Sequence, residues 1–237
     1  MIIFTFVVLT VSILAVTYVF LVMPRVTDGA DMDLQSTDYA HGGLHSKSVA
    51  PYSAEAFRIA KELGYGIELS VSLSRSGEIF ATPPRRRYRP QSSFTLCELL
   101  ELIDGQVPLL IEIPAGDTAP KLCRSLCLIL DEYHGAFAVE SFDPWVLSFF
   151  KKYRPRYARG QMVSGSSKFL TKHLFTNVIS RPDFIVTEGA LMNEPAFLLA
   201  TKLFCRRGFV RPVVNGRQYS VCRRRSLYAV FEKIRPQ

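Results

Sequence analysis

The sequence predicts a (β/α)₈ barrel, also called a TIM barrel, preceded by a transmembrane helix. Three observations lead to this prediction: an uncharged apolar run at the N-terminus, eight short apolar or β-branched runs after residue 37, and amphipathic segments between most of these runs. Strands that alternate with helices are typical of a parallel sheet. Eight such units close into a barrel, and roughly 200 residues is the lower limit for this fold.

The N-terminal run covers residues 2–23 and contains no charged residue. As a helix it would be roughly 33 Å long, which is enough to cross a hydrocarbon core of about 30 Å. A cleaved signal peptide is the alternative. We favour an uncleaved, single-pass anchor because the run exceeds a usual signal-peptide core, no Lys or Arg precedes it, and no clear small-residue cleavage site stands before Pro24.

The rest of the chain divides into a linker and one barrel domain. Residues 24–37 are polar, contain Pro and Gly, and are typical of a juxtamembrane linker; we assign 1–23 to the transmembrane helix and 38–237 to the barrel. The expected strands are 38–42, 66–73, 108–114, 136–142, 157–163, 183–189, 210–216 and 228–232. The expected helices are 54–64, 95–105, 119–135, 143–153 and 194–208. Residues 217–227 leave little room for a helix, so a barrel that is imperfect in its last unit is an alternative.

The chain is basic, and its whole excess charge lies outside the apolar run. It carries 29 Lys and Arg against 21 Asp and Glu, a net charge of +8. Basic runs at 85–89, 205–207 and 222–226 predict attraction to an anionic lipid surface, at about 1 kcal/mol per residue. Binding to nucleic acid is a weaker alternative, because a chain anchored in a membrane meets lipid first. The simplest alternative is that the basic runs are solvated loops and helix ends without a binding function.

The side of the membrane on which the barrel lies stays open. Five cysteines form no evident disulfide framework, and Arg25 follows the helix, which together slightly favour the cytoplasm. The acidic residues Asp28, Asp31 and Asp33 weaken this preference.

Four carboxylates and a histidine fall at or near the ends of expected strands, where such barrels place their active sites. His41 ends the first strand, and Glu68, Glu112, Glu140 and Glu188 lie on later ones. An acidic residue inside an apolar strand is costly to bury unless it is paired or bound to a metal. These residues therefore predict an oxygen-rich cation site. The alternative is that Glu140 and Glu188 face loops or pair with arginines.

Several motifs, in order and at fitting spacing, resemble those of glycerophosphodiester phosphodiesterases. They are AHGG (40–43), the run from AEAF (54–57) through LGYGIEL (63–69), FTLCELLELI (94–103), PLLIEIP (108–114) and ESFDPWVL (140–147). The resemblance covers most of residues 38–160. It implies a TIM barrel that hydrolyses glycerophosphodiesters with a divalent cation held by carboxylates and with two histidines as acid and base.

The sequence departs from the family pattern at the positions that carry chemistry. The family's His-Arg-Gly, Pro-Glu-Asn, Glu-Leu-Asp, His-Asp and Glu-Ile-Lys read here as His41-Gly42-Gly43, Pro51-Tyr52-Ser53, Glu68-Leu69-Ser70, Pro83-Pro84 and Glu112-Ile113-Pro114. The second histidine, the motif aspartate, the arginine and the lysine are therefore missing. Each proton-transfer group is worth roughly 10² to 10⁴ in rate, and proline cannot transfer a proton.

These departures predict a membrane-anchored, catalytically degenerate phosphodiesterase-like protein. His41 would be a remnant acid/base, and Glu68 and Glu112 would bind Mg²⁺ or Ca²⁺ weakly. The expected ligands are phospholipid headgroups, phosphodiesters or a protein partner. The alternative is an active metal-dependent phosphodiesterase that acts on glycerophosphodiesters or lysophospholipids with relocated groups, such as Glu140, Glu188 or His45.

Overall fold

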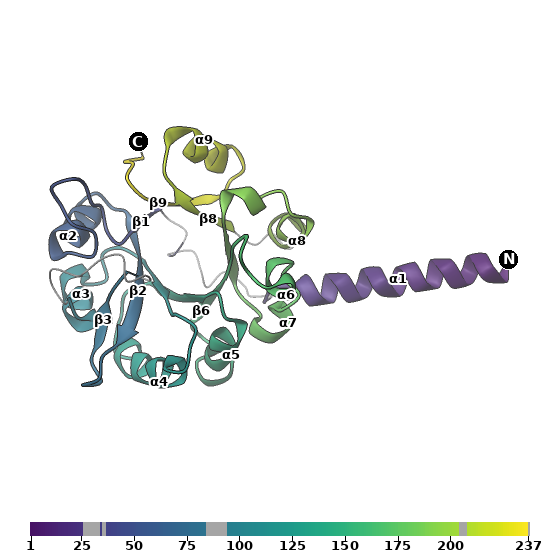
Figure 1. The fold of residues 1–237 in the computed structure, drawn as a ribbon, viewed down its shortest axis with the longest axis horizontal. Helices are drawn as coiled ribbons and strands as arrows, with labels where there is room; N and C mark the ends of the chain where they lie inside the picture. Colours follow the sequence, from purple (N-terminus) through teal and green to yellow (C-terminus); the bar gives the residue numbers. More distant parts are fainter. Residues whose placement is uncertain (26–33, 35–36, 84–93, 204–207, 237) are drawn as a thin grey trace.

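A computed structural model describes residues 1–25, 34, 37–83, 94–203 and 208–236. Its centre is a closed barrel of eight parallel strands, surrounded by helices (Figure 1). The barrel strands are β1 Tyr39–His41, β2 Gly66–Leu73, β4 Leu109–Glu112, β5 Phe137–Ser141, β6 Ala158–Val163, β7 Phe184–Thr187, β8 Gly208–Val213 and β9 Tyr228–Phe231. The eight predicted strands and the TIM-barrel fold are thus confirmed.

The barrel closes because β1 pairs in parallel with both β2 and β9. The carboxylate of Asp38, just before β1, strengthens this closure. It accepts one hydrogen bond from the backbone N–H of Ala229 at 2.8 Å and another from the Tyr219 hydroxyl at 2.9 Å. The alternative of an open last unit is therefore excluded, because β1 pairs with β9 and residues Gly216–Arg224 form a helix, α9, whose first turn is capped by Asn215. The pairing of β8 with β9 does shift register between Val210 and Val213.

The surrounding helices mostly match the amphipathic segments of the sequence. They are α2 Ala54–Glu62, α3 Leu96–Ile103, α4 Ala119–Leu130, α5 Pro144–Tyr153, α6 Phe169–Lys172, α7 Asn177–Ser180, α8 Pro195–Leu198 and α9, with the π-helical turn η3 Leu199–Leu203 after α8. Capping residues place several starts: Thr95 and Glu98 form a capping box at α3, and Asp143 caps α5 just before Pro144. The short helices α6 and α7 and the strand β3 Ile79–Ala81, which forms a hairpin with β2, were not expected.

Aromatic rings fill the interior of the barrel near the N-terminal ends of its strands. Phe209 packs against Tyr39 and Phe184, with ring centroids 5.7 Å and 4.9 Å apart. Gly66 and Gly160 make room for these rings, since a Cβ there would come within 2.5 Å of the Tyr39 ring or 2.3 Å of the Phe184 ring. The packed floor leaves the opposite end of the barrel, called the mouth below, for polar side chains.

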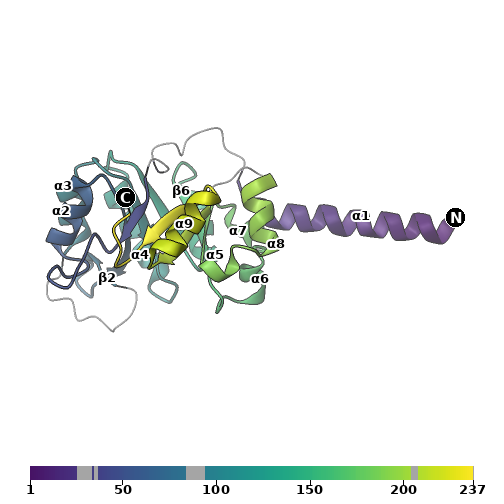
Figure 2. The ribbon, with the colours of Figure 1, turned by 90° about the horizontal axis from the view of Figure 1, so that it is seen from above.

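The helix α1, Ile2–Val22, projects from the outer wall of the barrel beside α6, α7 and α8 (Figures 1 and 2). Among the described residues it is the one helix that is long and apolar enough to cross a membrane, with a mean hydropathy of 2.5. Its last turn is docked on the barrel, because Val22 is fully buried in the same core as the barrel helices. The domain boundaries at 23 and 37 stay predictions, and the acidic residues 28, 31 and 33 lie outside the described residues.

Candidate functional site

The register of the barrel strands brings the predicted residues together at the mouth. His41 lies opposite Glu68 across β1 and β2, Ser70 lies opposite Glu112 across β2 and β4, and Glu112 lies opposite Glu140 across β4 and β5. Residues that share a register in neighbouring parallel strands point to the same side of the sheet. Because the polar residues at this level face inward, three carboxylates and one imidazole converge inside the barrel.

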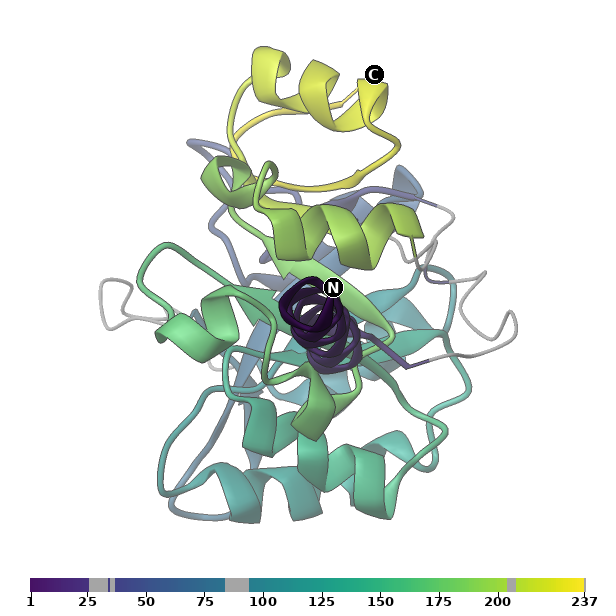
Figure 3. The same cartoon turned by 90° about the vertical axis from the view of Figure 1, so that its right-hand side faces the viewer.

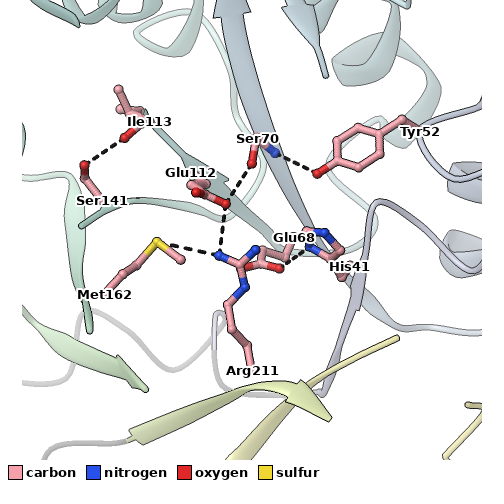
Figure 4. Close-up of polar contacts among 9 residues, drawn as sticks. All are labelled: His41, Tyr52, Glu68, Ser70, Glu112, Ile113, Ser141, Met162 and Arg211. Carbon is pink, nitrogen blue, oxygen red and sulfur yellow. Dashed lines mark hydrogen bonds and ion pairs between the residues drawn. The ribbon is translucent and has the colours of Figure 1, made fainter. Parts of the chain in front are cut away.

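An arginine from β8, Arg211, reaches between two of these carboxylates (Figure 4). Its Nη1 donates a hydrogen bond of 2.9 Å to Glu112 Oε2. Its Nε lies 3.0 Å from Glu68 Oε1, an ion pair without hydrogen-bond geometry. Both carboxylates are buried, so solvation by water cannot compensate their charge, and the guanidinium does so instead.

Glu68 also contacts His41. The two are joined between His41 Nδ1 and Glu68 Oε2 at 2.6 Å (Figure 4). A carboxylate can only accept a hydrogen bond, so we assign the proton of this contact to Nδ1. The imidazole packs edge-on against Tyr52, with ring centroids 5.9 Å apart. His41 is therefore held in one orientation by a carboxylate and an aromatic ring.

Two residues that replace family carboxylates make polar contacts at the same level. Ser70 donates its hydroxyl proton to Glu112 Oε2 at 2.7 Å, and its backbone N–H donates to the Tyr52 hydroxyl at 3.3 Å. Neutral hydroxyl groups therefore lie at these two positions. Tyr52 and Ser70 satisfy the neighbouring atoms but add no negative charge, which lowers the demand for a cation.

The charges at the mouth divide unequally between the carboxyl groups. Burial raises the pKa of Glu68, but the charges of Arg211 and then His41 more than offset this, so the pKa of Glu68 lies well below its usual value. Burial first, and then the charge of Glu68, raise the pKa of Glu140 well above its usual value. The surroundings therefore favour the ionised form of Glu68 and the protonated form of Glu140. Among the described residues, neither carboxyl oxygen of Glu140 has a hydrogen-bond partner of ordinary geometry.

A cavity of about 360 Å³ opens above this cluster. His41, Glu112 and Arg211 line it with Glu188, and the remaining walls are largely apolar; they are Phe142, Met162, Val163, Val186, Pro212, Val230 and Glu232. Glu188 accepts a hydrogen bond from the backbone N–H of Gly165 at 2.9 Å. His45 does not line the cavity, and burial lowers the pKa of this half-buried imidazole. Glu188 therefore lines the mouth cavity, while His45 lies close to His41 and Glu232 without lining it.

Arg211 is the residue that sequence reasoning missed. It lies in the expected strand 210–216, in VRPVVNG, between the paired residues Val210 and Val213, where the register with β9 shifts. An arginine in an otherwise apolar strand is a signal of a buried partner, because an unpaired charge is too costly to bury. The position that departs from the family's second histidine is described only in part, since Pro84 lies outside the described residues.

The residues at the mouth do not fit a divalent cation. Arg211 already pairs with both Glu68 and Glu112, and Ser70 stands where a second ligand of the Glu-x-Asp type would be. Within the described parts of the chain, no group of three or more His, Cys, Asp or Glu side chains is arranged to hold a metal ion. Weak Mg²⁺ or Ca²⁺ binding stays a prediction that needs measurement.

A larger cavity, of about 920 Å³, lies between α8 and the end of α9, beside the first residues of β8 and β9. Lys202, Arg223, Arg224 and Arg225 line it, so the predicted basic run 222–226 gathers there. The basic runs 85–89 and 205–207 lie outside the described residues. We place the candidate site at the mouth despite the smaller volume, because the buried ionisable groups converge there.

Comparison with solved structures identifies the fold. The chain is similar to a glycerophosphodiester phosphodiesterase from Parabacteroides distasonis, with 16% identity, a TM-score of 0.65 and coverage of 83% of this chain and 94% of that one. It is also similar to a phosphodiesterase from Oleispira antarctica in complex with the product sn-glycerol-3-phosphate, with 15% identity, a TM-score of 0.67 and coverage of 84% of this chain and 93% of that one. A calcium-dependent phosphoinositol-specific phospholipase C from a Pseudomonas species is similar with 9% identity, a TM-score of 0.52 and coverage of 88% of this chain and 93% of that one.

These likenesses confirm that the chain folds like the glycerophosphodiester phosphodiesterases its motifs resemble. No protein-family model matches the sequence, and no curated protein is significantly similar to it. At 16% identity or less, the comparison establishes the fold and leaves the activity to be argued from the site.

Proposed function

We propose that this chain is a membrane-anchored, glycerophosphodiester phosphodiesterase-like barrel that binds ligands at its mouth without hydrolysing them. The observation that carries this proposal is the guanidinium of Arg211 between Glu68 and Glu112. A metal ion in a phosphodiesterase must leave coordination positions open for the substrate oxygens. A guanidinium has no such positions, because it interacts only through its N–H donors.

Loss of proton-transfer groups supports the same proposal. His41 is the remaining histidine of the resembled pair, and because its Nδ1 contacts Glu68, only Nε2 is left for proton transfer. His45, the nearest replacement, does not line the mouth cavity. A site with one acid/base group in place of two should hydrolyse a phosphodiester more slowly, by a factor of roughly 10² to 10⁴.

The mouth keeps the features of a binding site for a small polar group. Its volume of about 360 Å³ lies within the range of about 300–1,000 Å³ that is common for ligand sites. Among the described residues, the polar contacts of Arg211 use Nε and Nη1, so a guanidinium donor at Nη2 is available for a phosphate oxygen. We propose a phospholipid headgroup or a soluble glycerophosphodiester as the ligand; a protein partner is the alternative outcome.

The anchor rests on α1. Its length and composition fit a membrane span, and a cleaved signal peptide passes the same test. The barrel, however, buries Val22 and donates a hydrogen bond of 2.7 Å from the Asn177 side chain to its carbonyl. Removing α1 would expose this buried contact, which favours retention of the helix in the mature protein.

The test uses the full chain in lipid nanodiscs. Incubation with glycerophosphocholine, glycerophosphoethanolamine and lysophospholipids, in Ca²⁺ or Mg²⁺, should release no product beyond that given by His41→Ala. Glycerophosphocholine should still bind, and Arg211→Met should weaken that binding. Metal-dependent release of glycerol phosphate that His41→Ala abolishes would overturn the proposal and establish the active phosphodiesterase instead. Extraction from membranes by alkaline carbonate would contradict the anchor.

A further inference from the structure

The helix α6 exposes two large apolar side chains beside the base of α1. Phe169 and Leu170 are 67% and 56% exposed. Figures 1 and 2 both place α6 next to the point where α1 leaves the barrel, and Figure 3, seen from the side on which α1 projects, shows the surrounding wall that would face a membrane. Two adjacent exposed apolar residues at this place need an explanation.

A chain of aromatic contacts links these residues to α1. The ring of Tyr18 in α1 meets the ring of Phe175 edge-on, with centroids 5.8 Å apart. Phe175 in turn lies 6.2 Å from Phe169. The surface of α6 is therefore continuous with the surface of the helix that we propose to span the bilayer.

The barrel is held to α1 in a defined orientation. Besides the hydrogen bond from Asn177 to the carbonyl of Val22, Arg181 donates to the carbonyls of Phe20 at 3.3 Å and Met23 at 2.9 Å. The Arg181 guanidinium also lies over the Phe20 ring, 4.7 Å from its centroid. These contacts occupy the carbonyls at the C-terminal end of α1. A helix tied in this way cannot turn freely against the barrel, so the same wall always faces the bilayer.

The depth of α6 matches the membrane interface. Tyr18 precedes Val22 by four residues, or about 6 Å along the helix. If the apolar span ends at Val22, the wall that contacts Tyr18 lies within the outer 5–10 Å of the bilayer, where interfacial apolar side chains insert. Lys168, which is exposed, and Lys172, which is half-buried, flank the two apolar residues. This pattern suits an anionic interface.

We propose that α6 is a second membrane contact, in which Phe169 and Leu170 insert into the interface of the bilayer spanned by α1. Lys168 and Lys172 then lie among anionic headgroups. The partner is an anionic phospholipid surface. This inference rests on the proposed anchor but not on the proposed loss of turnover. It fixes the barrel with its axis along the membrane, so that the mouth opens sideways over the lipid headgroups.

The single tryptophan of the chain makes a direct test possible. In the full chain, Trp145→Phe removes the native signal, and Phe169→Trp then places the one indole on α6. The matched control is Leu128→Trp in the same background, because Leu128 is 74% exposed on α4, away from α1 (Figure 1). Both proteins are reconstituted in vesicles of phosphatidylcholine and phosphatidylglycerol with bromine on the acyl chains, and vesicle flotation is checked in the same samples.

We expect the brominated lipid to quench the tryptophan at position 169 at least twofold more than the tryptophan at position 128. Replacing Lys168 and Lys172 by Gln should reduce this difference and remove its dependence on phosphatidylglycerol. Equal quenching of the two reporters in protein that floats with the vesicles would overturn the α6 contact and leave the anchor intact. Failure to float would overturn the anchor and this inference together.

Discussion

At the scale of single residues, the contacts of one side chain, Arg211, decide how the polar groups of the site are arranged. Arg211 brings one positive charge, fixed to β8, to the two buried carboxylates Glu68 and Glu112. A divalent cation would bring two charges and would exchange its ligands. In the function that we propose, the arginine holds the carboxylates in place and leaves no open coordination position for phosphoryl chemistry.

Replacing Arg211 by Met should destabilise the fold. The change leaves Glu68 and Glu112 buried near each other without their cation, and breaking a buried pair in this way typically costs about 3–5 kcal/mol. Chemical denaturation at pH 7 measures the free energy of unfolding. The control is Arg75→Met, which removes an exposed arginine and should change the free energy by less than about 0.5 kcal/mol. Equal free energies of unfolding for the two variants would show that the ion pairs of Arg211 make no net contribution to stability.

Glu140→Gln should reveal the proton on Glu140 through the pH dependence of stability. The pKa of Glu140 is raised well above the usual 4.5 in the folded protein. Between these two values the folded state binds more protons than the unfolded state, so stability falls as pH rises, by at most about 1.4 kcal/mol per pH unit. Glutamine cannot ionise, so the Glu140→Gln variant does not lose stability in this way as pH rises.

The advantage of Glu140→Gln over the wild type should therefore grow as pH rises above 4.5 and stop growing once the pH passes the folded pKa. Denaturation midpoints from pH 4 to pH 9 measure it. Curves for the two proteins that stay parallel over this range would mean that Glu140 is ionised in the fold. Glu68 has the opposite sign: its lowered pKa adds stability that is lost as pH falls below about 4.5.

At the scale of secondary-structure elements, the junction between α1 and α7 is the contact that orients the barrel. Asn177 is fully buried and donates to the carbonyl of Val22 at 2.7 Å. Asn177→Ala leaves that buried carbonyl without its donor, which should cost about 1–3 kcal/mol. Thermal unfolding in nanodiscs measures the loss. Asn193→Ala, at an exposed asparagine, is the matched control, and an equal effect of both changes would argue against a docked helix.

Elements also show what the sequence could and could not predict. The eight strands were predicted because apolar period and length are local properties. The helix α9 was missed because polar and charged residues such as Arg217, Arg223 and Arg224 leave it without a broad apolar face; it is stabilised by the Asn215 cap and by the buried Cys222. The short helices α6 and α7 have too few residues for a helical period to be recognised.

At the scale of the whole molecule, barrel closure decides which predicted site residues meet. The sequence placed His41, Glu68, Glu112 and Glu140 near strand ends, and the parallel register then brought them to one level. It did not predict the pairing with Arg211, because β8 lies about 140 residues after β2 in the chain and only the closed barrel brings them together. The motifs predicted which groups of the resembled family are absent from this sequence, and the closed barrel shows which side chains lie at the mouth.

The most direct test of the account is a calorimetric titration of Ca²⁺ into the full chain and into Arg211→Met. If Arg211 takes the place of the cation, the wild type and Glu68→Gln should give the same small heat, without saturable binding below millimolar Ca²⁺. Arg211→Met should bind Ca²⁺ with a Kd on the order of 10⁻⁴ to 10⁻³ M, as expected for few carboxylates, and Glu112→Gln should abolish that binding. Tight, saturable binding by the wild type that Glu68→Gln removes would contradict the account.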